Sequence, residues 1–215
     1  MQFYYGFCVS TGLIHNVFSN LQPLILASAS PRRSGLLRSL GIQFSLCVTQ
    51  TDETIELDEK PNDYVRRMAE AKAANAACLN PTDWILSADT IVVCENKIFG
   101  KPADSSEAMQ MLLQLSGLKH KVMTAFTLQN PTRGVIETSL ETAYVTMLES
   151  NILLLKAYVA SGEPLDKAGA YAVQGQGGVL IKKIEGAYST IVGLPVHRVV
   201  ASLLSYEVIK AVVRS

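Results

Sequence analysis

The chain has 215 residues, of which 48% are hydrophobic, and its 19 Lys and Arg residues balance 19 Asp and Glu residues to a formal net charge of zero. This composition is typical of a globular protein, and it lacks the basic excess that binding to a nucleic-acid polymer requires. The sequence contains no apolar stretch long enough to span a membrane. A small anionic ligand held by a few well-placed cations fits the sequence better than a polymer or a membrane does.

The beginning of the chain is uncharged, since residues 1–31 contain no Asp, Glu, Lys or Arg. The stretch lacks the basic start and the unbroken apolar core of a secretory signal, and it lacks the arginines of a transit peptide. We therefore predict an N-terminal extension over residues 1–23, which either packs against the domain or is disordered. A single α/β domain is expected over residues 24–215, in a protein of the cytoplasm.

The segment that follows is the most informative part of the chain. Residues 24–27 form an apolar run that predicts a buried strand, and a helix is predicted to begin at Pro31 and to end before Gly41. Unpaired amide groups at the start of a helix attract anions, and arginine side chains can grip phosphate oxygens in pairs. One interpretation is a phosphate site, and the other is a pair of solvated arginines on the surface. The candidate residues are Ser28, Ser30, Arg32 and Arg33.

An acidic loop and an amphipathic helix come next. Residues 43–48 are predicted to form a second strand, and the loop at 49–60 carries Glu53. A helix is predicted over residues 61–79, with Lys72 at the border of its apolar face. That position allows the Lys72 side chain to reach the ligand site.

Asp89 directly follows another apolar run, from Trp84 to Ala88, which predicts a buried strand. Open α/β sheets bind their ligands at the carboxyl ends of strands. A strand that ended here would place Asp89 in the same crevice as the phosphate-binding turn. The alternative is an aspartate that only stabilises a turn.

The remaining elements predict a mixed sheet. Asp104 and Glu107 are spaced as a capping box at the start of a helix. Residues 120–128 and 135–147 alternate between polar and apolar, which predicts two long strands that run antiparallel. The last predicted elements are a helix at 150–161, a strand at 179–184 and a helix that begins at Pro195.

The cysteines and histidines do not form a metal-binding pattern. There is no CxxC motif, no HExxH motif and no cysteine beside a histidine, so a zinc site is not expected. A hard ion held by carboxylates and phosphate remains open. The four cysteines are expected to be reduced thiols in the core: Cys8, Cys47, Cys78 and Cys94.

Several separated motifs, taken together, resemble the Maf family of nucleotide pyrophosphatases, also called septum formation inhibitor homologues. The resemblance extends from Leu24 to about residue 204. It rests on Leu-Ala-Ser-Ala-Ser-Pro-Arg-Arg (26–33), Asp-Glu (52–53), Ala-Glu-Ala-Lys-Ala (69–73), Ala-Asp-Thr (88–90), Gly-Lys-Pro (100–102), Leu-Ser-Gly with His120 (115–120), Asp-Lys-Ala-Gly-Ala-Tyr (166–171), Gln-Gly (174–175) and Val-Gly-Leu-Pro (192–195).

The resemblance implies a mixed α/β sheet flanked by helices, with a deep cleft between two lobes, as in inosine triphosphatase-like folds. It implies a homodimer that hydrolyses a nucleoside triphosphate to the monophosphate and pyrophosphate with a divalent ion (Mg, Mn or Co). Asp89 would be the catalytic base, and Glu53 would hold the metal or orient water. Either carboxylate could bind the ion while the other takes the proton. The triphosphate would be held by Arg33, Lys72 and Lys101, together with Ser28 and Ser30.

Arg32, Thr90 and Gln174 stand at the positions that separate subfamilies, and this combination resembles the branch that acts on dTTP and UTP. The Gln174 amide carries both a donor and an acceptor, so it can pair with the O4 and N3–H edge of thymine or uracil. Modified pyrimidine nucleotides are further candidate substrates.

Two other readings remain open. The first is an enzyme that hydrolyses purine triphosphates such as inosine or xanthosine triphosphate. The second is a non-catalytic nucleotide-binding regulator of cell division. A P-loop NTPase is excluded, because the sequence contains no G-x-x-x-x-G-K-[ST] motif.

Overall fold

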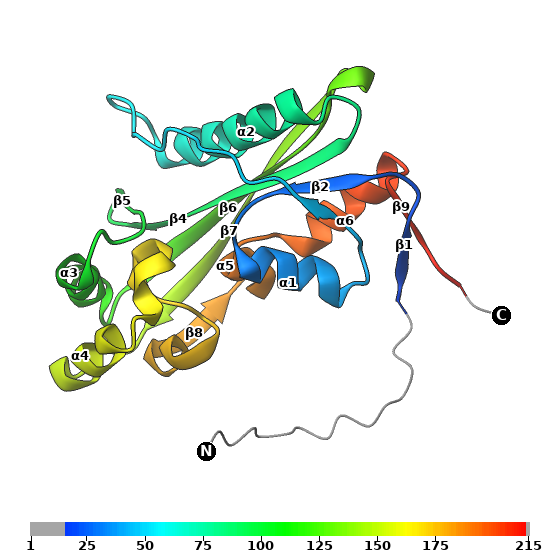
Figure 1. The fold of residues 1–215 in the computed structure, drawn as a ribbon. Helices are drawn as coiled ribbons and strands as arrows, with labels where there is room; N and C mark the ends of the chain where they lie inside the picture. Colours follow the sequence, from blue (N-terminus) through cyan, green and yellow to red (C-terminus); the bar gives the residue numbers. More distant parts are fainter. Residues whose placement is uncertain (1–15, 214–215) are drawn as a thin grey trace, which may run out of the picture.

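The computed structural model describes residues 16–213, and a mixed sheet lies at its centre (Figure 1). The strand order is β3-β2-β4-β6-β7-β8, and β5 pairs with β4. β2 is parallel to β3 and β4, whereas the other neighbours are antiparallel. The mixed sheet is therefore as predicted. Its strands are β2 (Leu24–Ala27), β3 (Ser45–Leu46), β4 (Trp84–Cys94), β5 (Lys97–Phe99), β6 (Lys119–Asn130), β7 (Val135–Met147) and β8 (Ile181–Glu185).

Helices cover both faces of this sheet. The α2 helix packs on one face, and α1, α5 and α6 lie on the other, as Figure 1 shows. The α3 and α4 helices stand at one end of the long strands with the 3₁₀ turns η2, η3 and η4. Their bounds are α1 (Pro31–Ser39), α2 (Pro61–Leu79), α3 (Ser105–Leu115), α4 (Ile152–Ala160), α5 (Tyr188–Val192), α6 (Val196–Ser205), η1 (Pro131–Arg133), η2 (Glu163–Asp166), η3 (Ala168–Ala170) and η4 (Gly175–Leu180).

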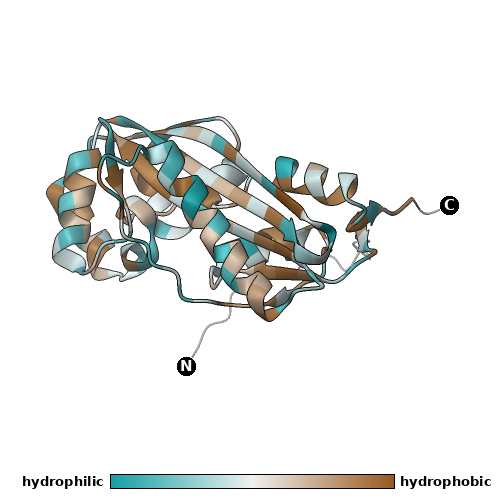
Figure 2. Ribbon diagram, turned by 90° about the horizontal axis from the view of Figure 1, so that it is seen from above, coloured by the Kyte–Doolittle hydropathy of each residue, from teal (hydrophilic) through white to brown (hydrophobic). Residues whose placement is uncertain are grey.

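The helix starts follow the local sequence. Pro31 and Pro61 occupy first-turn positions, where the missing N–H would have had no partner in the helix. The side chain of Asp104 accepts a hydrogen bond from the backbone N–H of Glu107 at the start of α3. Figure 2 shows brown segments along the strands, whereas the helices mix brown with teal, which is the pattern of helices that bury one face.

Two apolar clusters fill opposite ends of the long strands and define two lobes. One contains Leu112 of α3 and Tyr158 of α4, packed on the end of β4 that includes Cys94. The other contains Leu37 of α1 and residues of α6, packed on the beginning of β4 at Trp84. Because β4, β6 and β7 run through both clusters, the two lobes share one sheet.

The described part of the N-terminal extension contacts the domain. The β1 strand (Phe18–Asn20) pairs antiparallel with β9 (Ile209–Ala211) near the C-terminus. The Gln22 side chain accepts a hydrogen bond from the indole N–H of Trp84 at 2.9 Å. The extension therefore joins the domain from β1 onward, and its first 15 residues lie outside the described part.

Some local predictions were wrong. The second strand is only the two-residue β3, because β2 is too short to pair with all of residues 43–48. The cysteines are not all core thiols, since Cys94 is buried, Cys47 is partly buried and Cys78 is exposed on α2. Cys8 lies outside the described residues. No helix within residues 16–213 is both long and apolar enough to cross a membrane.

Candidate active site

A gap along one edge of β4 creates the site. β2 pairs with β4 only as far as Ser87, and β5 begins to pair at Val92. Between them, the edge of β4 at Asp89, Thr90 and Ile91 faces a cavity of about 610 Å³. The turn after β2 closes one side of this cavity, and the segment after β5 with η2 closes the other. The cavity is the predicted cleft between the lobes.

Asp89 lies inside a strand and not at its end, so that prediction was wrong. β4 is one continuous strand, because β6 pairs with it from Ile85 to Val93. The parallel partner β2, however, stops at Ala27, opposite Ser87. Asp89 therefore lies beside the carboxyl end of β2, which explains why it still faces the predicted crevice.

Lys72 joins the two candidate catalytic carboxylates. Its Nζ lies 2.7 Å from Oδ1 of Asp89 and 2.7 Å from Oε1 of Glu53. The Lys72 and Asp89 side chains are 17% and 12% exposed, whereas that of Glu53 is 50% exposed. The three residues come from α2, β4 and the loop before α2, and the fold brings them together at one point.

Electrostatics keep Glu53 ionised. Partial burial acts to raise its pKa, but the hydrogen bond and the charge of Lys72 outweigh burial, with Lys101 and Arg33 adding to the effect. The pKa of Glu53 therefore lies below its ordinary value. The Tyr64 hydroxyl donates to the Glu53 backbone carbonyl at 2.9 Å and anchors the loop to α2. Sequence reasoning missed Tyr64, because its place on the apolar face of α2 marked it only as a core residue.

Arg33 is bound mainly to the protein itself. Its Nε donates to the carbonyl of Gly193 at 2.8 Å, Nη1 donates to Ser28 Oγ at 3.1 Å and Nη2 donates to Thr90 Oγ1 at 3.1 Å. Burial lowers its pKa, and Asp89 partly offsets that effect. Arg33 thus joins α1 to β4 and to the end of α5, and only its remaining N–H groups are left for a ligand.

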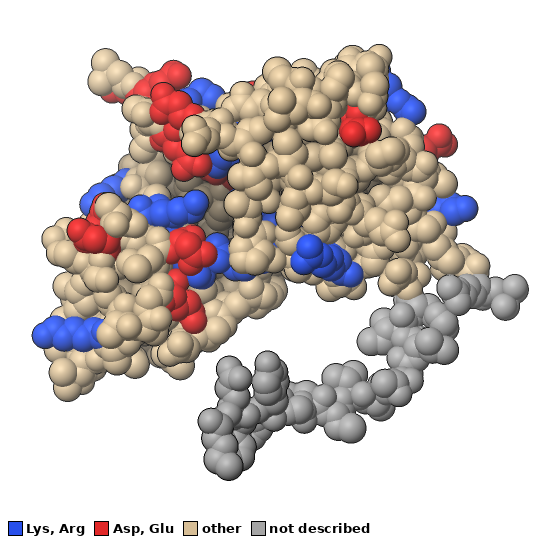
Figure 3. Space-filling model, viewed as in Figure 1, with Lys and Arg blue, Asp and Glu red and all other residues tan. Residues whose placement is uncertain are grey.

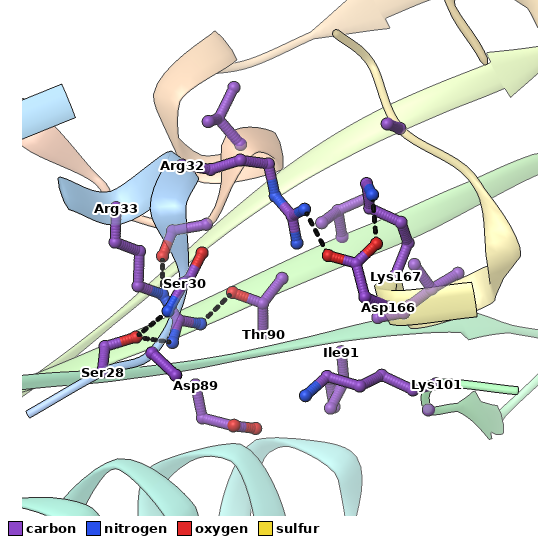
Figure 4. Close-up of a pocket in the computed structure, with 18 of the residues that line it drawn as sticks. Ser28, Ser30, Arg32, Arg33, Asp89, Thr90, Ile91, Lys101, Asp166 and Lys167 are labelled. Atoms are coloured by element: carbon purple, nitrogen blue, oxygen red, sulfur yellow. Dashed lines mark hydrogen bonds and ion pairs between the residues drawn. The ribbon is translucent and has the colours of Figure 1, made fainter. Parts of the chain in front are cut away.

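The start of α1 borders the cavity as predicted (Figure 4). Ser28 Oγ accepts from the Ser30 amide at 3.2 Å as well as from Arg33. Ser30 is the N-cap residue of α1 in extended conformation, but its side chain makes no capping hydrogen bond. Both serines line the cavity beside the first turn of α1, so their hydroxyl groups can donate to an anion there.

Thr90 points away from Asp89, because neighbouring residues of a strand face opposite sides of the sheet. Its hydroxyl lies 2.9 Å from that of Thr124 and accepts from Arg33. Thr90 is thus committed to holding Arg33. Gln174 lines the cavity directly before η4 and is exposed.

The remaining candidate residues are Lys101 and Arg32, which border the cavity from different elements. Lys101 follows β5, and neither an ion pair nor a hydrogen bond from its side chain is found within residues 16–213. Arg32 Nη1 contacts Oδ2 of Asp166 at 3.2 Å, and Asp166 also contacts the Lys167 ammonium group (Figure 4). Asp166 and Lys167 were absent from the predicted site, although they begin the Asp-Lys-Ala-Gly-Ala-Tyr motif.

The cavity carries a positive balance. Five basic residues and three acidic residues line it, and Figure 3 shows charged side chains of both signs around the hollow. No cluster of three or more His, Cys, Asp or Glu residues suitable for a metal occurs in the described part of the chain. This excess of positive side chains suits a ligand that brings its own negative charge, such as a polyphosphate. The lining basic residues are Arg32, Arg33, Lys72, Lys101 and Lys167, and the acidic ones are Glu53, Asp89 and Asp166.

With this geometry in place, sequence comparison identifies the family. The family described as "Maf-like protein" matches residues 23–206. The chain belongs to the Maf-like family. The matched region contains all the cavity residues discussed above, and it begins directly before β2.

Two relatives of this Maf-like protein carry the same enzyme name. A protein of Desulfotalea psychrophila named dTTP/UTP pyrophosphatase is 44% identical over 87% of this chain and 96% of its own length. A protein of Geotalea uraniireducens with the same name is 47% identical over 84% of this chain and 93% of its own length. The solved Ham1 protein of Staphylococcus aureus is 10% identical over 60% of this chain and 73% of that chain, with a TM-score of 0.42.

Proposed function

We propose that this Maf-like protein is a nucleoside triphosphate pyrophosphatase that hydrolyses dTTP and UTP to the monophosphate and pyrophosphate. The observation that carries the proposal is the placement of Lys72 between Glu53 and Asp89 on the open edge of β4, inside a positively lined cavity. The names of the two relatives, which match most of the chain, support this choice of substrate. Modified pyrimidine nucleotides fit the same proposal.

The triphosphate would lie between the start of α1 and the segment after β5. Lys101 faces the cavity without a partner of its own in residues 16–213, so it can pair with phosphate oxygens at little cost. The first-turn amide groups of α1 and the hydroxyls of Ser28 and Ser30 would bind further oxygens. Arg33 would contribute through the N–H groups that it does not use within the protein.

The two carboxylates fit a hard divalent cation. Lys72 Nζ lies 2.7 Å from an oxygen of each, which supports the proposal that these carboxylates together attract a positive charge. Within residues 16–213 two carboxylates converge there, so phosphate oxygens and water would complete the coordination, as Mg²⁺ prefers. When bound, Mg²⁺, Mn²⁺ or Co²⁺ would neutralise developing charge on the phosphate.

The roles of the two carboxylates are separated in the proposal by their rigidity. Asp89 lies on a strand that pairs with β6 on its other side, and its side chain is nearly buried, so its orientation is fixed. A fixed carboxylate is suited to take a proton from water aimed at the α-phosphorus. Glu53 lies on a loop and is half exposed, which suits a ligand that adjusts to the ion. Lys72 would hold both in place and pair with the phosphate.

The three residues at the positions that separate subfamilies would have different functions in this protein. Gln174 is exposed to the cavity and would read the edge of the pyrimidine ring. Arg32 lies in the first turn of α1 and reaches across the mouth of the cavity to Asp166 of η2 (Figure 4). Thr90 would act through Arg33 rather than touch the base. The homodimer, which the resemblance implies, and the cytoplasmic location, which we expect from the sequence, remain predictions, and light scattering of the purified protein tests the first.

The Asp89→Asn variant tests the proposal. The amide keeps the size of the side chain but removes the basic oxygen, so pyrophosphate release from UTP is expected to fall by about 10² to 10⁴-fold, the usual contribution of a general base. The dissociation constant for UTP, measured by calorimetry in Mg²⁺, is expected to change little. Release at the parental rate would show that Asp89 is not the base.

A matched control separates catalysis from damage to the fold. Asp83 is a carboxylate in the turn before β4, outside the cavity, and Asp83→Asn is expected to leave pyrophosphate release unchanged. A parent protein that binds UTP but releases no pyrophosphate would favour the non-catalytic regulator. Faster turnover of ITP or XTP than of UTP would favour the purine enzyme.

A further inference from the structure

The short turn η2 places two acidic residues where they contact both proposed base-selectivity elements. It runs from Glu163 to Asp166 on the wall of the cavity opposite α1. Asp166 lines the cavity. Glu163 does not line it, and its carboxylate contacts the segment that follows Gln174. Neither residue has a role in the mechanism proposed above.

Glu163 holds the turn that follows Gln174. Its Oε2 accepts from the amide of Gln176 at 3.0 Å, and Oε1 accepts from the amide of Gly177 at 3.0 Å. The Tyr158 hydroxyl donates to Oε1 at 3.1 Å and itself accepts from the Ala172 amide at 3.1 Å. Burial opposes ionisation of Glu163, but the two amide hydrogen bonds outweigh it, and its pKa lies below the ordinary value. An ionised, acceptor-only carboxylate therefore faces three donors.

The glycines of this turn allow the carboxylate to come so close. A Cβ on Gly175, which has φ of +75°, would lie 2.7 Å from Oε2 of Glu163. A Cβ on Gly177 would lie 2.5 Å from the Ala172 carbonyl and 2.6 Å from the Tyr158 hydroxyl. The turn therefore packs against Glu163 and Tyr158 without room for a side chain at either glycine. These contacts restrain the backbone of Gln174, which directly precedes the turn.

Asp166 contacts the second selectivity residue. It pairs with Arg32 Nη1 at 3.2 Å, across the mouth of the cavity between η2 and α1 (Figure 4). The Lys167 ammonium group contacts Asp166 and donates to the Glu163 carbonyl at 2.9 Å, which ties both ends of η2 together. The Asp166 side chain is 60% exposed, so its single ion pair with Arg32 is expected to contribute less than the three hydrogen bonds that Glu163 accepts.

Selectivity for a pyrimidine needs such positioning. Uracil presents an acceptor at O4 and a donor at N3–H, and hypoxanthine presents the same pair at O6 and N1–H. The amide of Gln174 can therefore pair with either base. The two bases differ in size, because the paired edge of hypoxanthine lies farther from the sugar than that of uracil. The distance between Gln174 and the bound sugar and triphosphate therefore decides which base fits.

We propose that Glu163 and Asp166 are positioning residues that set nucleobase selectivity, Glu163 by fixing the turn that carries Gln174 and Asp166 by holding Arg32. The inference rests on the proposed function, because it assigns these residues to the selectivity of that same site. Neither carboxylate contacts the reacting phosphate.

The test compares kcat/KM for UTP and ITP, which share the ribose and the triphosphate. Glu163→Gln replaces an acceptor oxygen by an NH₂ group that faces an amide donor, so the UTP-to-ITP ratio is expected to fall by about tenfold, the effect of losing one hydrogen bond to a charged acceptor. Loss of base binding raises KM for UTP and leaves kcat nearly unchanged. Tyr158→Phe, which removes one donor to Glu163, is expected to lower the ratio less. Asp166→Asn is expected to lower it by about twofold, the size of an exposed ion pair.

A double variant and a control complete the experiment. In a Gln174→Ala background, Glu163→Gln is expected to change the ratio no further, because the side chain that it positions is gone. Glu70→Gln changes an exposed carboxylate of α2 outside the cavity and is expected to keep the parental ratio.

Thermal unfolding of each variant shows whether it is folded, and hydrogen exchange at the Gln176 and Gly177 amides reads the contact directly. Faster exchange in Glu163→Gln is expected. An unchanged ratio in folded Glu163→Gln, or the same fall with and without Gln174, overturns the inference. A parent enzyme that turns over ITP as well as UTP instead contradicts the proposed pyrimidine selectivity itself.

Discussion

At the scale of single residues, the site depends on side-chain alternation along β4. Asp89 faces α2 and meets Lys72, whereas Thr90 faces the other side of the sheet and meets Arg33. Two neighbouring residues of one motif thus serve different halves of the site. The Ala-Asp-Thr motif indicated that both matter, but which partner each would find depended on the helices packed on either face.

Replacing Lys72 by Met is expected to raise the pKa of Glu53, because burial continues to disfavour the ionised carboxylate once the opposing charge is lost. If ionised Glu53 is needed, the acid limb of the kcat/KM profile for UTP moves to higher pH. The residual activity of Lys72→Met measured across pH shows the shift. Lys72→Arg keeps the positive charge and is expected to keep the acid limb at the parental pH. An acid limb that does not move in Lys72→Met would contradict the role of Glu53.

At the scale of elements, the early end of β2 decides where the cavity lies. Apolar runs predicted β2 and the first half of β4, and the sequence indicated the charged residues that border them. That β4 continues past Asp89 could not be predicted, because a polar Asp-Thr pair inside a strand resembles a strand end until its pairing with β6 is known. The role of Arg33 as a link between α1, β4 and α5 was equally hidden, since its partners Gly193 and Thr90 are far away in sequence.

Arg33→Lys is expected to destabilise this junction. A lysine reaches fewer of the three acceptors and leaves the Gly193 carbonyl without its donor, so the free energy of unfolding in urea should fall by about 1–3 kcal/mol. Lys101→Ala, at an exposed residue, is expected to change it by less than about 0.5 kcal/mol while raising KM for UTP. Equal stability of Arg33→Lys and the parent would show that Arg33 serves the ligand alone.

At the scale of the whole molecule, two lobes on one sheet should unfold together. The family resemblance predicted this architecture and named many of the side chains that line the cavity, whereas Tyr64 and Glu163 were missed because they act through backbone groups that no motif displays. His120 in the α3/α4 lobe is buried, and its Nε2 lies 2.8 Å from the Tyr171 hydroxyl. Burial lowers the pKa of His120 to about 4, from an ordinary value of 6.5.

This depressed pKa predicts a pH dependence of stability. His120 of the unfolded chain binds a proton below about pH 6.5, whereas His120 of the folded protein binds one only near pH 4. The free energy of unfolding therefore decreases as the pH falls from about 6.5 to about 4. The loss is about 1.4 kcal/mol per pH unit for one proton. Urea unfolding at several pH values should show a shallower loss for His120→Gln than for the parent, and the exposed His197→Gln variant should match the parent. Parallel curves for all three would contradict the assignment.

The most direct test of the account is the position of water attack. UTP hydrolysed in ¹⁸O-enriched water with Mg²⁺ should give UMP that carries the label and pyrophosphate that does not, because the cavity is proposed to aim water from Asp89 at the α-phosphorus. Mass spectrometry of the two products reads this outcome. Label in pyrophosphate, or formation of UDP and inorganic phosphate, would contradict it.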